Sequence, residues 1–487
     1  MLESPIILIL SVGLILIYFV KLLIINKYHE LNIDQYNHTA FIQSLSTNFK
    51  LKVSALRETN TYPFLIHLMM KNIKNKLISK YFSLFFEVLF LILMSFYLLS
   101  IGADLKSILS VLLVLSISTT SFSQVRFFSA RVLGLFLFNT ILLASYTYLP
   151  LGIKILIEIA CLVPIFLASK FAHQAFVFII LPVAVFFLKI DIIISYALAL
   201  LLTYIITKGF IIEILKAHIL HCYWSFFNHM DYYVYGHYYR EFENEKFERN
   251  EFSLKRSIRN LASFFKNPVV ILIPIFFIFI GGIQLDFNTT SILIVLFIFL
   301  VLALYTRLNR SIGESGRYFD YILLPLSISL YNSGIFETNF FYIVLLAIIV
   351  AAFARIILLI KKENKSLRAA GRIFDNNVSA ELEIFLRKLP RGRVVSLPIS
   401  ISNYLATITE HEYYYPFSYL SQYFLQRSGI LPFFKFDNNN LLNKKYIDYL
   451  VVDVRQIPQE YLEQIINKYK YSLIFHNAIY QVYQKIK

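Results

Sequence analysis

The polar stretch that follows the first long apolar run contains side chains that can transfer a proton. Asp34 lies in NIDQYNHTAFIQSL (residues 32–45), with Tyr36 and His38 at steps of two residues. Asp34 and His38 share one face if this stretch is helical. A carboxylate at a membrane–water boundary can act as a general base when it is aimed at a hydroxyl group. The structural alternative is that Asp34 caps a helix in the loop.

A second group of candidates closes the same polar insertion. TNTYPFLIHLMMK (residues 59–71) carries Tyr62, Pro63 and His67 just before the next apolar run. Tyrosine and histidine can donate hydrogen bonds to a bound substrate. The alternative is that Tyr62 and Pro63 simply open the next helix.

Three segments between apolar runs gather basic side chains. The planar guanidinium group of arginine can donate paired hydrogen bonds to phosphate oxygens, and a lysine adds a point charge. Basic clusters that return to one membrane face would therefore hold a lipid phosphate or pyrophosphate. The alternative is that they are snorkelling residues that mark the ends of spans. The segments are SQVRFFSARVLG with Arg126 and Arg131, ASKFAHQAF with Lys170 and His173, and YTRLNRSIGESGRYFDY with Arg307, Arg310, Glu314, Arg317 and Asp320.

A histidine-rich segment gives a weaker signal for a metal site. His218, His221 and Cys222 fit one helical face, and His229 and His237 follow them. No carboxylate or second cysteine stands at a spacing that completes a metal site, and the surrounding aromatic residues are typical of a membrane-interface belt. No nucleotide-binding loop or nucleophile elbow is present, which argues against an ATP-driven pump.

Composition identifies the elements that must position these residues. The chain has 487 residues, of which 58% are apolar and only 16% charged, whereas a soluble protein carries roughly 25% charged residues. This composition predicts an α-helical polytopic membrane protein. We expect about eleven transmembrane helices, near 5–26, 81–101, 106–122, 132–149, 151–168, 174–189, 191–213, 268–284, 290–306, 320–335 and 338–361.

The predicted membrane domain spans residues 1–361 and has long insertions at 27–80 and 214–267. Acidic residues inside its apolar runs are conspicuous at Glu87 and Glu158, and the run 151–168 has to bury the second of them. They do not form the ladder of buried charges that ion-coupled transport requires.

Residues 362–487 contain no apolar run long enough to span a membrane and predict a small soluble α/β domain. SAELEIFLRKLP and IPQEYLEQIINKY have helical periodicity, whereas RGRVVSLPIS, YIDYLVVDV and the two closing segments YSLIFHN and AIYQVYQKI read as strands. The formal net charge of the whole chain is +16. In a chain this apolar, the charge indicates membrane lipids or lipid phosphates as partners, and no nucleic acid.

Taken together, these segments resemble the polytopic glycosyltransferases of the GT-C fold, a superfamily that includes the dolichyl-phosphate-mannose mannosyltransferases. DQYNH (residues 34–38) is similar to the aspartate motif of the family's first extracytoplasmic loop, and TYPFLIHLMM to the proline-containing segment that leads into span two. GESGRYFDYILLP (residues 313–325) looks like a Gly-Glu-x-x-Arg-Tyr segment of uncharacterised members. The ending, from YIDYLVVD to AIYQVYQ, resembles the family's soluble tails.

The resemblance implies an inverting transfer of a sugar in the cell (plasma or inner) membrane, for cell-envelope glycan assembly. The donor would be a polyprenyl-phosphate-linked sugar and the acceptor a hydroxyl of a glycan, lipid or protein, with Asp34 as the catalytic base. Many members have two adjacent acids in this loop, whereas Gln35 follows Asp34 here. The expected cofactor is therefore none or a divalent cation. By motif, charge and location we assign substrate binding to His38, Tyr62, His67, Arg126, Arg131, Lys170, Arg307, Arg310, Glu314 and Arg317.

Two arguments about the orientation of the chain in the membrane disagree. Eleven spans and a catalytic first loop outside the cytoplasm require an extracytoplasmic C-terminal domain. The positive-inside rule predicts the reverse. The basic residues of the first insertion include Lys50, Lys52, Arg57, Lys71, Lys74 and Lys76.

Three other functions fit parts of the sequence. A flippase or transporter of polyprenyl-linked saccharides would also need a basic cavity. A polysaccharide polymerase or ligase would combine many spans with a large loop. A non-catalytic scaffold of the cell envelope would need neither Asp34 nor the arginines of residues 307–317.

Overall fold

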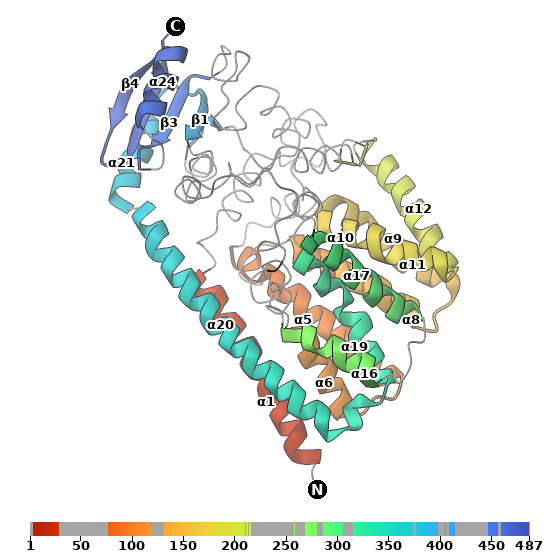
Figure 1. The fold of residues 1–487 in the computed structure, drawn as a ribbon. Coiled ribbons are helices and arrows are strands. Elements are labelled where there is room, and N and C mark those ends of the chain that lie inside the picture. The colour runs from red at the N-terminus through yellow and green to blue at the C-terminus, as the bar shows by residue number, and fades with distance from the viewer. Residues whose placement is uncertain are drawn as a thin grey trace.

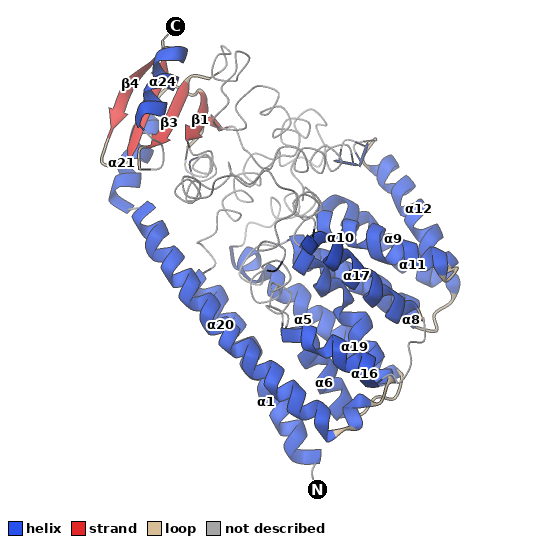
Figure 2. Ribbon diagram, viewed as in Figure 1, coloured by secondary structure: helices blue, strands red, loops and turns tan. Residues whose placement is uncertain are grey.

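In the computed structural model, the protein consists of a helical bundle and a small sheet domain. One long helix runs from the bundle towards the sheet (Figures 1 and 2). The described residues are 3–28, 76–117, 130–209, 211, 212, 214, 215, 258, 268–279, 286–304, 315–373, 376–397, 405, 409–413, 447–455 and 459–486. The strands gather in the part of the molecule near the C-terminus, where helices pack beside them, whereas the described part of the bundle is helical, as Figure 2 shows.

The bundle contains helices that follow the apolar runs of the sequence. In its first half these are α1 (Glu3–Tyr28), α5 (Lys76–Ser100), α6 (Leu105–Ser116), α8 (Ala130–Tyr146), α9 (Leu151–Ala168), α10 (Lys170–Ala175), the π-helical η1 (Phe176–Ile180), α11 (Leu181–Phe186) and α12 (Ile190–Ile206). In its second half they are the 3-10 helix η4 (Pro268–Ile271), α16 (Leu272–Phe279), α17 (Phe287–Leu304), the 3-10 helix η5 (Ser315–Ile322), α19 (Leu323–Asn332), the 3-10 helix η6 (Ile335–Glu337) and α20 (Asn339–Ile373).

Length and composition mark part of this bundle as membrane-spanning. Among the described residues, four helices contain a window that is long and apolar enough to cross a membrane. At 1.5 Å per residue, 18 to 22 residues cover the roughly 30 Å of hydrocarbon. The windows are Pro5–Asn26, Lys80–Ser100, Leu151–Ala168 and Asn339–Leu358. The structure therefore supports a helical membrane protein with a small sheet, and the expected number of eleven spans stays a prediction.

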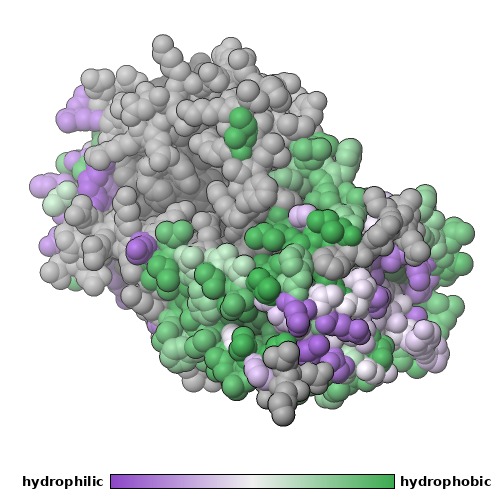
Figure 3. All heavy atoms as spheres, turned by 60° about the horizontal axis from the view of Figure 1, so that its bottom comes forward, coloured by the Kyte–Doolittle hydropathy of each residue, from purple (hydrophilic) through white to green (hydrophobic). Residues whose placement is uncertain are grey.

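The outer surface of the bundle is apolar, as lipid contact requires. Figure 3 shows apolar residues over much of the visible surface of the bundle. Large side chains such as Phe85, Phe96, Leu156 and Ile343 are each at least 60% exposed. A soluble bundle would turn polar residues to this surface.

Short turns connect helices at one end of the bundle, which we call the turn end. Gly102 has φ 79° and Gly334 has φ 69°, in the left-handed region that favours glycine, and these residues close the turns after α5 and α19. The opposite end, called the domain end below, is where α1 stops, α8 begins and η5 begins. Helix α20 runs from the turn end to the domain end and on to the sheet (Figure 1).

The sheet forms where the sequence predicts strands. Its strands are β1 (Arg393–Leu397), β2 (Glu412–Tyr413), β3 (Tyr449–Asp453), β4 (Tyr471–His476) and β5 (Tyr480–Lys485), in the order β2-β1-β3-β5-β4. β1 is parallel to β2 and β3, and β5 is antiparallel to β3 and β4. The helices of this part are α21 (Asn376–Lys388) and α24 (Gln459–Tyr469).

The burial of its residues agrees with the central position of β3 in the sheet. All five residues of β3 are buried, as expected for a central strand with both faces covered. Val451 of β3 lies opposite Val482 of β5 and both belong to one apolar cluster with Leu386 of α21. The boundary expected at residue 361 lies within α20, which continues as a single helix to Ile373.

Candidate functional site

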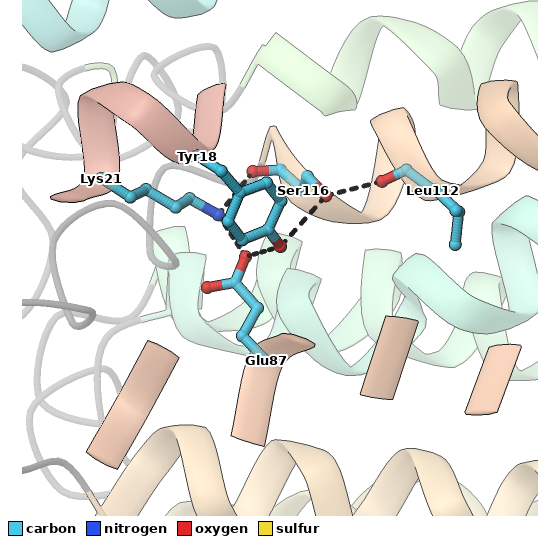
Figure 4. Close-up of polar contacts among 5 residues, drawn as sticks. All are labelled: Tyr18, Lys21, Glu87, Leu112 and Ser116. Carbon is cyan, nitrogen blue, oxygen red and sulfur yellow. Dashed lines mark hydrogen bonds and ion pairs between the residues drawn. The ribbon is translucent and has the colours of Figure 1, made fainter. Parts of the chain in front are cut away.

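A cluster of polar side chains joins α1, α5 and α6 inside the bundle. We call Tyr18, Lys21, Glu87 and Ser116 the Lys21 cluster (Figure 4). The Lys21 ammonium donates to Glu87 Oε1 and, at 3.0 Å, to the carbonyl oxygen of Ser116. The Tyr18 hydroxyl donates to the same Glu87 oxygen at 2.9 Å and lies 3.4 Å from Ser116 Oγ. Three helices are thus held together by one carboxylate and one ammonium group.

Because both side chains are largely buried, each charge of this ion pair depends on the other for its stability. Lys21 is 0% exposed and the Glu87 side chain 11% exposed. Glu87 lies on the opposite side of α5 from the lipid-exposed Phe85, Ile92 and Phe96, so the carboxylate faces the interior of the bundle. Lys21 lies five residues before the end of the apolar window of α1, about 8 Å along the helix. A charge at this depth is costly unless it has a partner.

Lys21 also satisfies the end of a short helix. Ser116 is the last residue of α6, whose 12 residues cover about 18 Å, too little to cross the hydrocarbon. The last carbonyl groups of a helix lack partners within it. The Lys21 ammonium binds one of them and is favourable at the negative end of the helix dipole.

A second cluster gathers cations and aromatic rings at the domain end. We define the Arg131 cluster as Arg131 of α8, Lys170, Phe171 and His173 of α10, and Tyr196 of α12. The guanidinium carbon of Arg131 lies 4.9 Å from the centre of the Phe171 ring. Lys170 is 5% exposed and His173 7% exposed. His173 Nε2 lies 3.3 Å from the Tyr196 hydroxyl. Arg131 and Lys170, which were predicted separately, thus lie on adjoining helices.

A glycine sets the distance between the helices that carry these cations. A Cβ atom at Gly134 of α8 would lie 2.2 Å from Ser169 Oγ and 2.9 Å from Ala172 Cβ. Ser169 separates α9 from α10, and its hydroxyl accepts a hydrogen bond from the Ala172 amide. Gly134 follows Arg131 by three residues and so lies on the same side of α8. Any side chain at 134 would push α8 away from Lys170.

The 3-10 helix η5 reaches the same place. It contacts both α8 and α10, and Tyr321 packs on Phe138 of α8 with ring centres 4.8 Å apart. Asp320 in this helix is buried. Arg317, one turn earlier, lies in the first turn of η5. Parts of all three predicted basic segments therefore meet at the domain end.

The structure can be compared with the predicted site residues only in part. It places Arg131 and Lys170 on contacting helices and Arg317 in η5. The remaining candidates lie outside the described residues; they are Asp34, His38, Tyr62, His67, Arg126, Arg307, Arg310 and Glu314. The histidine segment 218–237 also lies outside them. Within the described ranges, no group of three or more histidine, cysteine or acidic residues is placed to hold a metal ion.

Sequence reasoning missed the Lys21 cluster. It noted Glu87 as an acid inside an apolar run but did not consider Lys21, an opposite charge inside the preceding run. Two such charges in neighbouring spans are a signal for an ion pair, because neither is tolerated alone in lipid. Tyr196 was also missed, since one tyrosine among many in this chain carries no signal.

The second intramembrane acid has a different environment. Glu158 of α9 is 0% exposed, which confirms that its span buries it. Its Oε2 accepts a hydrogen bond of 2.6 Å from Ser195 Oγ of α12. Among the described residues, Glu158 Oε1 has no hydrogen-bond partner. The contact joins α9 to α12 and makes this acid a helix–helix contact in the bilayer.

The sheet region contains its own buried charge. Asp453, at the end of β3, is fully buried and accepts hydrogen bonds from Arg455 Nε at 3.0 Å and Nη2 at 2.8 Å. The side-chain hydrogen bond to Asp453 raises the pKa of Arg455. Burial raises the pKa of Tyr471 and lowers the pKa of Lys485. The Lys485 ammonium lies 5.9 Å from the centre of the Tyr471 ring. The Asp453–Arg455 pair compensates for the burial of a charge at the end of β3.

Comparison with known proteins does not identify a relative. No protein-family model matches the chain, and no match was found among curated proteins.

Proposed function

We propose that this chain is an integral membrane glycosyltransferase of the GT-C type that uses a polyprenyl-phosphate-linked sugar. The observation that carries the proposal is the contact between α8, α10 and η5, which brings Arg131, Lys170 and the segment containing Arg317 to one end of the bundle. A lipid-linked phosphate is the anion expected at such a position, because its apolar chain lies in the bilayer beside the cations.

The Arg131 cluster supplies groups suited to a phosphate leaving group. The Arg131 guanidinium can donate paired hydrogen bonds to phosphate oxygens, and Lys170 adds a second positive charge. Burial of Lys170 strengthens its attraction to an anion because water screens it less. These charges would stabilise the phosphate as it leaves.

Asp34 completes the proposed reaction as the general base. Residues 29–75 connect α1 to α5, whose adjoining ends lie at the domain end. The Asp34 carboxylate takes the proton of an acceptor hydroxyl while that oxygen bonds to the anomeric carbon of the sugar. The bond from this carbon to the phosphate oxygen breaks, and its electron pair leaves with the polyprenyl phosphate. Attack opposite the leaving group inverts the anomeric configuration.

The proposal includes eleven spans, an N-terminus in the cytoplasm and an extracytoplasmic sheet domain. Helix α1 begins at the turn end of the bundle, and α20 ends on the side of the domain end. An odd number of membrane crossings requires the start of the first span and the end of the last span to lie on opposite sides in this way. The basic residues Arg131 and Lys170 at the domain end are then explained by substrate binding rather than by the positive-inside rule.

The proposal is tested by separating binding from transfer. Polyprenyl phosphate without a sugar is the binding probe, and a panel of polyprenyl-phosphate hexoses and pentoses is the donor set. Asp34→Asn should abolish transfer and leave binding of polyprenyl phosphate unchanged. Arg131→Gln and Lys170→Gln should each weaken that binding about tenfold, as expected for the loss of a charged hydrogen bond. Lys189→Gln, at the turn end, is the matched control and should change neither.

The alternatives give other patterns in the same experiment. A flippase would lose lipid movement in the Arg131 and Lys170 variants but tolerate Asp34→Asn. A polymerase or ligase would extend or attach chains of several sugars, where a transferase adds one. A scaffold would tolerate all three substitutions. Full transfer activity in Asp34→Asn would overturn the proposed mechanism.

A further inference from the structure

Helix α20 continues well beyond the part of it that can lie in hydrocarbon. It has 35 residues and ends at Ile373, whereas its apolar window ends at Leu358. The last part, residues 361–373, reads KKENKSLRAAGRI. At 1.5 Å per residue, these 13 residues extend the same helix by about 20 Å. We call residues 361–373 the stem.

Four of the five basic residues of the stem follow the period of the helix, and the fifth, Lys362, lies about 100° from Lys361 around the axis. Lys361, Lys365, Arg368 and Arg372 are separated by four, three and four residues. At 3.6 residues per turn, these positions fall within an arc of about 60° on one side of α20. Glu363, the only acid in the stem sequence, falls on the opposite side. Lys361, at the start of this basic row, is exposed.

The neighbouring helix shows what an ordinary solvated helix of this chain looks like. α21 mixes both signs of charge, and its Arg387 pairs with Glu383 one turn earlier, at 2.6 Å. Such mixed pairs are typical of a helix surrounded by water. The stem instead carries one sign on one side. A row of this kind indicates a partner with a negative surface along that side.

We propose that the basic row of the stem binds the anionic headgroups of the leaflet from which α20 emerges. The row begins three residues after the apolar window, where the headgroup layer begins. A helix that leaves the bilayer at a tilt keeps one long side towards the headgroups. Lysine and arginine side chains can extend back along the helix to reach phosphate groups. The interaction does not depend on the transfer reaction proposed above.

The test uses the full chain in lipid nanodiscs. Cys161 and Cys222 are replaced, and an environment-sensitive fluorophore is attached to a cysteine at position 369, beside the row (Ala369→Cys). Emission is compared between discs of phosphatidylcholine and discs of an equimolar mixture with phosphatidylserine. Anionic lipid should increase the emission and shift it to the blue, and added salt should reverse the change because it screens exposed charges.

Matched variants assign the effect to the row. Lys365→Gln with Arg368→Gln should remove most of the change in emission in the discs that contain phosphatidylserine, because each basic residue near the surface contributes about 1 kcal/mol. Lys388→Gln with Arg391→Gln removes the same charge from α21 and the turn after it, and should leave the response unchanged. No sugar donor is present, so the outcome is independent of whether the chain transfers a sugar.

Three results would overturn the proposal. Equal emission in both kinds of disc would show that the row does not bind anionic lipid. An equal loss in the two pairs of variants would attribute the effect to net charge. The same shift on adding soluble glycerophosphoserine to phosphatidylcholine discs would identify a site for a free anion rather than a bilayer surface.

Discussion

At the scale of single residues, the Lys21 cluster shows how strongly a buried charge depends on its partner. One carboxylate oxygen of Glu87 accepts from both Lys21 and Tyr18, and the Lys21 ammonium also binds the last carbonyl of α6. Loss of either charged partner leaves an ion in a low-dielectric interior. The cost of an isolated ion is larger than the net stability that the intact pair contributes.

This asymmetry predicts the result of a double-mutant cycle. Lys21→Met and Glu87→Leu should each destabilise the protein by about 3–5 kcal/mol, because each leaves one buried charge unpaired. The double variant should recover most of that loss. Thermal unfolding in detergent measures the cycle, and Lys154→Met at the turn end serves as a control for removal of a lysine. Losses that simply add in the double variant would contradict the interpretation.

At the scale of elements, the position of Arg131 relative to Lys170 depends on how closely α8 approaches the α9–α10 junction. Gly134 allows this approach because it has no Cβ atom to meet Ser169. The residue that fixes the geometry of the proposed phosphate site is thus one without a side chain, and it touches no substrate.

Gly134→Ala should therefore move α8 outward. We expect a loss of stability of about 1–3 kcal/mol from overpacking, and weaker binding of polyprenyl phosphate. The control is Gly152→Ala in the first turn of α9, where a Cβ atom would have no neighbour within 4 Å. That variant should be neutral or slightly more stable, since alanine favours a helix. Thermal unfolding and lipid binding measure both; equal behaviour of the two variants would contradict this role of Gly134.

The sequence predicted these elements better than their contacts. Apolar runs locate helices because lipid demands them, and strands in the last 126 residues follow from short alternating or buried segments. The ends were less predictable: the run expected at 106–122 yields α6, which ends at Ser116, and the run expected at 174–189 belongs to a helix that begins at Lys170. The end of α6 is satisfied by Lys21 of another helix, whereas the start of α10 is capped by Ser169, which directly precedes it.

The candidate site was predictable only as separate pieces. Arg131 and Lys170 are candidates because cations between apolar runs are suited to phosphate, and no local pattern in the sequence indicates that α8 and α10 make contact. Lys21 and Glu87 are 66 residues apart, so their pairing is a property of the bundle. Asp34 lies outside the described residues, and its role rests on the resemblance of its motif.

At the scale of the whole molecule, charge is unequally distributed between the two ends of the bundle. Lys106, Lys154 and Lys189 lie at or next to the short turns of the turn end. Acidic residues lie near them at Asp104 and Asp191. The domain end instead carries Arg131, Lys170 and the stem. The proposed transferase mechanism requires that end to lie outside the cytoplasm, whereas the charge distribution alone favours the cytoplasm.

Labelling with an impermeant thiol reagent in intact cells tests the orientation. Single cysteines at Gln35 and Ser400 should be labelled, and one at Tyr148 should not be. Tyr148 is fully exposed at the turn end, so lack of labelling there reports the membrane barrier rather than burial. Labelling of position 148 with protection of positions 35 and 400 would exclude the proposed mechanism, because Asp34 would then be cytoplasmic.

The unbroken length of α20 has a geometric consequence for the sheet domain. Each residue of an α-helix advances the chain by 1.5 Å and turns it by about 100°. The number of residues in the stem therefore sets both the height at which the chain leaves α20 and the direction in which it leaves. One inserted residue would rotate the end of α20 by more than a quarter of a circle, whereas seven would nearly restore its direction and raise it by about 10 Å.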